Sequence, residues 1–119
     1  MKFHYLLLTL CVLILGCAQS KGKRITEFSQ NDIDSGILVD VRTPQEFIDG
    51  HLDNAVNINW FDANFIKSFD TIDKSRPVYV YCKMGGRSAK AAHVLDSLGY
   101  SMVVNLEGGY DAFLANKKD

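Results

Sequence analysis

The sequence has few cysteines: three in 119 residues, at positions 11, 17 and 82. Cys11 lies in an apolar N-terminal segment that we expect to be removed, and Cys17 follows that segment. Cys82 is therefore the one thiol that we expect the processed chain to keep unmodified. A single thiol excludes an internal disulfide and a metal site made of several cysteines. It is either buried and inert or reactive, and the glycines and arginine that follow Cys82 favour the second.

The chain also has no excess of charge of either sign, since its 13 basic and 14 acidic residues give a formal net charge of −1. Proteins that bind nucleic acid or an anionic membrane surface through their charge usually carry a marked basic excess. The sequence therefore predicts neither partner. It has no internal repeat and no low-complexity segment, and nothing in it implies a metal or a cofactor.

The N-terminal segment has a basic residue ahead of an apolar run at 5–15. The run is shorter than the roughly 20 residues that a membrane-spanning helix needs, and it fits a secretory signal. Its end, Leu15-Gly16-Cys17, resembles the lipobox of bacterial lipoproteins, in which cleavage falls before the cysteine and the thiol carries diacylglycerol. The resemblance implies a signal peptide at 1–16 and lipidation of Cys17. A plain signal peptide cut near Ala18 is the alternative.

Such a lipid anchor would place the protein in the cell envelope, attached to a membrane. In a Gram-negative bacterium this means the periplasm or the outer membrane. Ala18 stands where some lipoproteins carry the aspartate that retains them at the inner membrane, which favours the outer membrane. The anchoring would come from the lipid and not from charge.

Cleavage before Cys17 would leave a lipidated cysteine and a short tether at 17–23, and one domain at 24–119. Apolar runs that suit buried strands alternate there with segments of helical spacing. We expect strands at 37–41, 55–58, 78–81 and 101–106, and helices at 44–49, 60–69, 88–98 and 110–116. Thr43 and Glu46 predict a capping box for the first helix. The alternation predicts an α/β fold with a mostly parallel sheet and helices on both sides.

Cys82 stands directly after the expected strand at 78–81 and ahead of the expected helix at 88–98. The N-terminus of a helix has unpaired N–H groups and partial positive charge, which favour an anion. A thiol in that field has a lowered pKa and becomes a thiolate nucleophile. Gly85 and Gly86 allow the loop to turn tightly and to approach a ligand closely. The loop therefore predicts cysteine chemistry on a small anionic substrate.

Four segments of the chain carry recognisable motifs. They are Asp40-Val41-Arg42 with Glu46-Phe47, Gly50-His51-Leu52 with Ala55-Val56-Asn57-Ile58, Tyr81-Cys82-Lys83-Met84-Gly85-Gly86-Arg87-Ser88, and Leu106-Glu107-Gly108-Gly109. In this order they resemble the rhodanese-like domain (sulfurtransferase) family, over about 25–113. The resemblance implies a three-layer α/β domain with a mostly parallel central sheet of about five strands flanked by helices. Asn54 replaces the family's usual glycine, and because Asn readily takes a positive φ the turn should be kept. Phe113 stands where a tryptophan is common.

The resemblance implies a sulfur transfer in two steps, with Cys82 as the catalytic residue. Its thiolate would take the outer sulfur of thiosulfate or a similar small anionic donor, release sulfite, and pass the sulfur to a thiol or cyanide acceptor. The substrate-binding loop would comprise Lys83, Met84, Gly85, Gly86, Arg87 and Ser88, with its N–H groups around the sulfur. Arg87 would bind the sulfonate oxygens of the donor or help to hold the loop. The alternative is an exposed first-turn arginine paired with a neighbouring carboxylate.

Other polar residues of these motifs have structural interpretations. Asp40 and Arg42 follow a central strand at the edge where parallel sheets bind ligands, and we expect a structural ion pair there rather than a catalytic one. His51 is expected to be a hydrogen-bonded structural histidine. Lys83 either adds positive potential at the mouth of the site or is merely solvated, and Met84 is expected at the rim.

Two other functions stay open. Phosphatases of related fold use a Cys-x5-Arg loop, and this chain would then be a phosphatase or an arsenate reductase. Cys82 and Arg87 enclose four residues, a shorter ring that suits a sulfur atom better than a tetrahedral phosphate. The domain is also compatible with a persulfide carrier or docking module that has little turnover.

Overall fold

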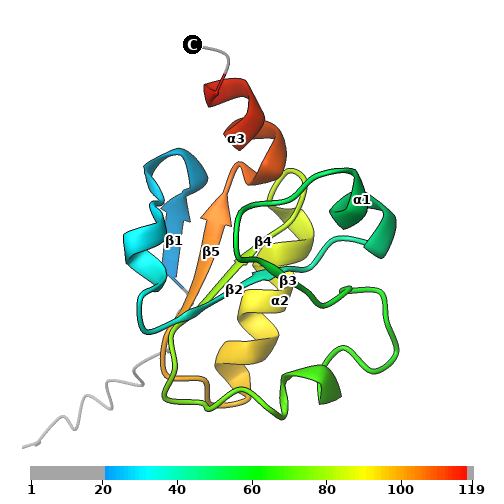
Figure 1. The fold of residues 1–119 in the computed structure, drawn as a ribbon. Coiled ribbons are helices and arrows are strands. Elements are labelled where there is room, and N and C mark those ends of the chain that lie inside the picture. Colours follow the sequence, from blue (N-terminus) through cyan, green and yellow to red (C-terminus); the bar gives the residue numbers. More distant parts are fainter. Residues whose placement is uncertain (1–20, 118–119) are drawn as a thin grey trace, which may run out of the picture.

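The structure is a computed structural model that describes residues 21–117 (Figure 1). The expected signal peptide at 1–16, the lipidation site Cys17 and the first part of the tether lie outside the described residues. Within 21–117 no helix is long and apolar enough to cross a membrane.

The centre of the fold is a sheet of five strands, all parallel to their neighbours. The strands are β1 (Lys21–Arg24), β2 (Ile37–Asp40), β3 (Val56–Asn57), β4 (Val78–Tyr81) and β5 (Val103–Glu107), in the spatial order β1-β5-β4-β2-β3. This confirms the predicted parallel sheet. The central strand β4 is buried along its whole length, as its continuous apolar sequence requires. One expectation was wrong: 21–23, assigned to the tether, belongs to strand β1, which pairs with β5.

Helices cover both faces of the sheet, as predicted. They are α1 (Pro44–Asp49), α2 (Gly86–Ser97) and α3 (Gly109–Asn116), with short 3-10 helices η1 (Ile25–Glu27), η2 (Gln30–Ile33) and η3 (Lys67–Phe69). Alternate residues of each strand point to opposite faces, so Val78 and Val80 pack against α2 while Tyr79 and Tyr81 face the other side. That second face is covered by residues around η1, η2 and α3.

The helix expected at 60–69 was wrong, because only η3 is helical there and the rest is a series of turns. The side-chain oxygens of Asn59 and Asp62 accept hydrogen bonds from backbone N–H groups two residues ahead, which gives the backbone an alternative to a helix. The apolar spacing that suggested a helix reflects packing. Phe65 stacks edge-on against both Trp60 and Phe69 in the core beneath α2.

Two predictions of local structure are confirmed in the segment between β2 and β3. Helix α1 begins with the capping box of Thr43 and Glu46, with Pro44 in its first turn. Asn54 adopts a φ of 65°, as expected for a residue that replaces glycine in a turn. The capping box matters for the site, because it fixes the position of the Glu46 carboxylate.

Candidate active site

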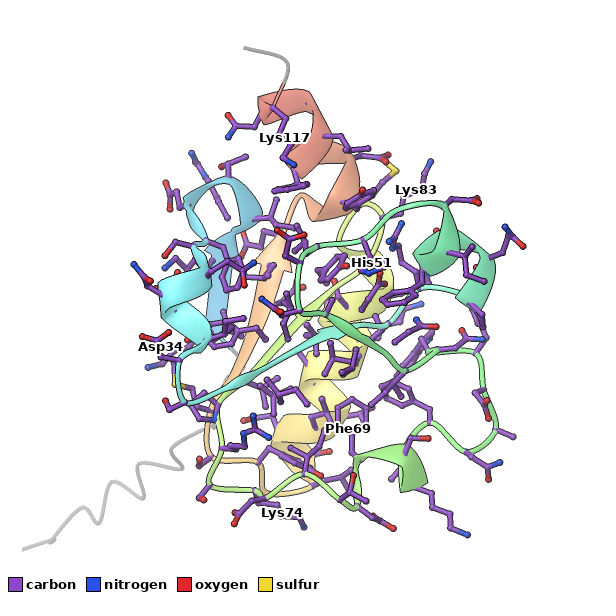
Figure 2. The ribbon with its side chains drawn as sticks, in the orientation of Figure 1. Asp34, His51, Phe69, Lys74, Lys83 and Lys117 are labelled. Atoms are coloured by element: carbon purple, nitrogen blue, oxygen red, sulfur yellow. The ribbon has the colours of Figure 1, made fainter. Side chains whose placement is uncertain are left out.

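The candidate site lies at the carboxyl end of the parallel sheet, where β4 ends and the loop to α2 begins. Figure 1 shows this loop at the same end of the sheet as the start of α3, which follows β5. Figure 2 places Lys83 at that end and Phe69 and Lys74 toward the other. Parallel sheets bind ligands at their carboxyl ends, so the fold places Cys82 where a ligand is expected.

The sulfur of Cys82 faces the hydrogen-bond donors of its own loop. The backbone N–H of Gly85 donates to Sγ at 3.0 Å. The Ser88 hydroxyl lies 3.3 Å from Sγ and 3.2 Å from the carbonyl oxygen of Gly85, so it can donate to either. Gly85 makes this geometry possible with a φ of 110°, a conformation that residues with a Cβ rarely adopt. The loop thus curls around the sulfur and directs its N–H groups inward.

These contacts set the pKa of Cys82. Burial raises that pKa, but hydrogen bonds from the Ser88 hydroxyl and from the N–H groups of Ser88, Gly85 and Met84 outweigh the effect of burial. The net result is a pKa below the ordinary value, in the direction that the sequence predicted. A thiolate is therefore favoured at this position.

Cys82 is buried, with 1% of its surface exposed, and burial alone would also fit an inert thiol. The residue nevertheless forms part of the wall of an open cavity of about 380 Å³. The other residues of the wall are Lys83, Met84, Gly86, Arg87 and Lys90. Cys82 thus lies between the core and an opening large enough for a small ligand. The hydrogen bonds to its sulfur and its place in the cavity wall together favour the reactive interpretation.

Helix α3 holds the loop from behind. The backbone N–H groups of Tyr110 and Asp111 donate to the carbonyl oxygens of Cys82 and Lys83 at 2.8 and 3.0 Å. Gly109 has a φ of 65°, and a Cβ there would overlap the backbone of Lys83. The sequence alone shows Gly108-Gly109 only as the end of a recognisable motif. The structure adds that its lack of side chains lets the N-terminus of α3 bind the outer carbonyls of the loop.

Arg87 is engaged by Glu46 across 41 residues of sequence. Its two terminal nitrogens donate to the two carboxylate oxygens at 2.7 and 3.0 Å. This hydrogen bond, opposed by partial burial and aided by Thr43, lowers the pKa of Glu46 to about 2. Arg87 is half-buried and its partner comes from a distant segment, so the pair ties the loop to α1, as expected if Arg87 helps to hold the loop. Its contact with the donor stays a prediction. The capping role of Glu46 was predicted from the sequence, but its ion pair with Arg87 was not.

Asp40 and Arg42 form the expected structural ion pair. Both are buried, with the Arg42 Nη2 to Asp40 Oδ2 distance at 2.7 Å and a further hydrogen bond from Arg42 to the Gly50 carbonyl. The Arg42 guanidinium also lies over the ring of Tyr110, 4.5 Å from its centre. Neither Asp40 nor Arg42 borders the cavity at Cys82. The pair therefore supports the frame of the site from behind.

The remaining predicted residues take positions at the rim or on the surface. His51 has its Nδ1 2.8 Å from the Phe47 carbonyl oxygen and stacks on the Phe47 ring, which confirms a hydrogen-bonded structural histidine. Lys83 lies 3.5 Å from Asp111 on the surface. Met84 is exposed at the mouth of the cavity. Lys90 also borders the cavity and was missed by the sequence analysis, because a lysine in a helix gives no local signal of the side it faces.

Comparisons with known proteins agree with this geometry. The family model described as the rhodanese-like domain matches residues 25–116. The Bacillus subtilis protein YqhL is 41% identical over 73 residues, which are 61% of this chain and 56% of that protein, so the match spans little more than half of its length. The thiosulfate sulfurtransferase GlpE of Shewanella oneidensis is 36% identical over 76 residues, 64% of this chain and 73% of that one. The crystal structure of SSP1007 from Staphylococcus saprophyticus superposes with a TM-score of 0.68 at 32% identity, covering 78% of this chain and 92% of that one.

Proposed function

Since the chain belongs to the rhodanese-like domain family, we propose that it transfers sulfane sulfur from thiosulfate or a similar small anionic donor to a thiol or cyanide acceptor. The observation that carries the proposal is the sulfur of Cys82, which accepts the Gly85 N–H at 3.0 Å, has a lowered pKa and borders an open cavity. Relatives named sulfurtransferases support the same reaction class. A location in the cell envelope depends on residues 1–17 alone and stays a prediction.

The first step converts the thiolate into a persulfide. The Cys82 thiolate attacks the outer sulfur of thiosulfate, the S–S bond of the donor breaks, and sulfite leaves with the bonding electron pair. No proton and no external oxidant is needed, because the outer sulfur goes from donor to enzyme. The N–H groups that stabilise the thiolate are also directed at the persulfide anion.

The second step returns the enzyme to its starting state. An acceptor thiolate attacks the outer sulfur of the persulfide, the new S–S bond of the enzyme breaks, and Cys82 leaves as a thiolate. With cyanide as the acceptor the product is thiocyanate. Because Cys82 forms part of the cavity wall, both donor and acceptor reach it by the same opening, one after the other.

A thiosulfate–cyanide assay of the full chain tests the proposal, with the Cys82→Ser variant as control. We expect thiocyanate formation by the unmodified protein and its complete loss in the variant. Mass spectrometry of the peptide that contains Cys82 should show a gain of one sulfur atom after thiosulfate alone. The substitution leaves Cys11 and Cys17 unchanged, so the variant also controls for sulfur bound to either of them wherever the protein retains it as a thiol. Turnover that survives Cys82→Ser would refute the mechanism.

The same assay separates the two alternatives. A persulfide carrier would gain the sulfur atom but form little thiocyanate. A phosphatase or arsenate reductase would act on oxyanions of phosphorus or arsenic without taking up sulfur. The ion pair of Arg87 with Glu46 speaks against phosphate chemistry, since both terminal nitrogens of this guanidinium already bind a carboxylate.

A further inference from the structure

Three cationic side chains border the cavity above Cys82, but they differ in how their charges are balanced. Arg87 forms a two-point ion pair with Glu46, and Lys83 lies 3.5 Å from Asp111. Among the ion pairs formed by residues 21–117, none includes Lys90. Of the three cations in the cavity wall, Lys90 is therefore the one that forms no ion pair with a carboxylate in the described part of the chain.

The position of Lys90 follows from the helix that carries it. Lys90 is four residues after Gly86 and three after Arg87 on α2, so the three residues share one side of the helix. That side borders the cavity. Lys90 is exposed, and its flexible four-carbon stem allows the ammonium group to remain hydrated while it reaches over the opening.

We propose that Lys90 binds the oxyanion end of the sulfur donor and so selects anionic donors. The inference rests on the proposed function. A donor such as thiosulfate must present its outer sulfur to Sγ of the buried Cys82, so its oxygens lie away from Cys82, on the side of the opening. Lys90 can meet these oxygens directly, whereas Arg87 must first give up its two hydrogen bonds to Glu46. Lys90, rather than Arg87, is then the principal contact of the donor, and it also holds the sulfite as that leaves.

The charge of the cavity can be measured without sulfur-transfer activity. Sulfonatoethyl and trimethylammonioethyl methanethiosulfonate carry the same reactive group with opposite charges. In each case the Cys82 thiolate attacks the sulfenyl sulfur, the S–S bond of the reagent breaks, and methanesulfinate leaves, so that a mixed disulfide forms. The ratio of the two rates reports the potential at the sulfur, since the intrinsic reactivity of the thiolate largely cancels.

The Lys90→Gln variant should lower the ratio of the anionic to the cationic rate about three- to tenfold, as expected for one unit charge near a partly hydrated site. Rates are followed on the peptide that contains Cys82, because the full chain has other cysteines. The Lys67→Gln variant is the matched control, because it removes the same charge from η3. Phe69, the last residue of η3, lies away from the Lys83 end of the molecule (Figure 2). Lys67→Gln should leave the ratio unchanged, and Lys90→Arg should restore it.

Thiosulfate kinetics complete the test. Lys90→Gln should raise the KM for thiosulfate about three- to tenfold with little change in kcat, and added salt should shrink the difference between the variant and the unmodified protein. An unchanged reagent ratio together with an unchanged KM would overturn the assignment of Lys90 while leaving sulfur transfer intact. A changed ratio in a protein that takes no sulfur from thiosulfate would instead refute the proposed function and the donor role of Lys90 while confirming its effect on the potential.

Discussion

The site is flanked by two arginine–carboxylate pairs that have the same chemistry and different surroundings. In the pair of Asp40 with Arg42 the side chains are 0% and 5% exposed, and in the pair of Glu46 with Arg87 they are 28% and 21% exposed. The first lies behind the site and contacts neither the cavity nor the sulfur. The second connects the active loop to α1, and its arginine forms part of the cavity wall.

The difference shows that burial decides whether such a pair acts on the stability of the fold or on the charge that a ligand meets. A fully buried pair has lost its hydration and depends on its partner, so it contributes to the uniqueness of the fold and tolerates no loss of one charge. A partly hydrated pair contributes little to stability but can still set the charge seen by a ligand. The Asp40–Arg42 pair should therefore affect mainly the stability of the fold, and the Glu46–Arg87 pair should contribute to the charge of the cavity beside Lys90.

The largest effect that tests this division is the Asp40→Asn substitution. It leaves the buried Arg42 without a counter-charge, which should cost about 3–5 kcal/mol of unfolding free energy. Denaturant unfolding followed by circular dichroism measures the loss.

A second substitution shows whether the cost comes from the uncompensated charge of Arg42 or only from the change at position 40. The double variant Asp40→Asn with Arg42→Met removes the stranded charge and should recover part of the lost stability, which a double-mutant cycle will show as a coupling between the two sites. A cost below about 1 kcal/mol for Asp40→Asn would mean that the pair is not structural, because that is the range of exposed pairs.

The contrast between the two pairs also shows what the sequence could predict. The Asp40–Arg42 pair could be predicted because the two residues stand two positions apart at the end of a recognisable strand. In the same way, the strand at 78–81 and the helix that follows the Cys82 loop can each be recognised from the pattern of a few neighbouring residues. The prediction that Cys82 meets the N-terminus of a helix needed nothing more than this order of elements.

Features that depend on distant pairing were missed. Strand β1 has the polar sequence Lys21–Arg24 and becomes a strand only by pairing with β5. Glu46 binds Arg87, and the Cys82 loop packs against Gly109. Both contacts join segments that are distant in the sequence and meet only in the folded protein. At 60–69 the local pattern gave a wrong prediction. Its apolar spacing comes from residues that pack in the core and not from a helix.

The second-largest predicted effect is the contribution of the Glu46–Arg87 pair to the free energy of unfolding. Glu46→Gln removes the charge but keeps a capping box at Thr43, because Gln fits that motif as well. We expect a cost of about 1 kcal/mol at neutral pH, several times smaller than that of Asp40→Asn.

The pH dependence of this difference identifies its origin. The pKa of Glu46 falls from its ordinary value of 4.5 to about 2 in the folded protein. A lowered folded-state pKa means that the stabilisation is complete above pH 4.5 and disappears as the pH falls toward 2. Unfolding curves of Glu46→Gln and the unmodified protein should therefore converge across this range. Asp32 and Asp73, which also have lowered pKa values, are present in both proteins and cancel from the comparison. A difference that stays constant down to pH 2 would exclude the ion pair as its source.

The smallest predicted effect is the one that links the Glu46 pair to function. Loss of the Glu46 charge makes the surroundings of the cavity more positive, and it frees Arg87 to face an anion. The ratio of anionic to cationic methanethiosulfonate rates at Cys82 should then rise about threefold in Glu46→Gln, opposite in sign to the change expected for Lys90→Gln.

The double variant, Glu46→Gln with Lys90→Gln, should give a ratio between those of the two single variants. Gln45→Glu, which adds a charge at the exposed neighbouring position of α1, provides the reverse control and should lower the ratio slightly. If Glu46→Gln lowered the ratio, the Glu46 carboxylate would not be offsetting positive charge at the cavity, and the proposed division of roles between the two pairs would be wrong.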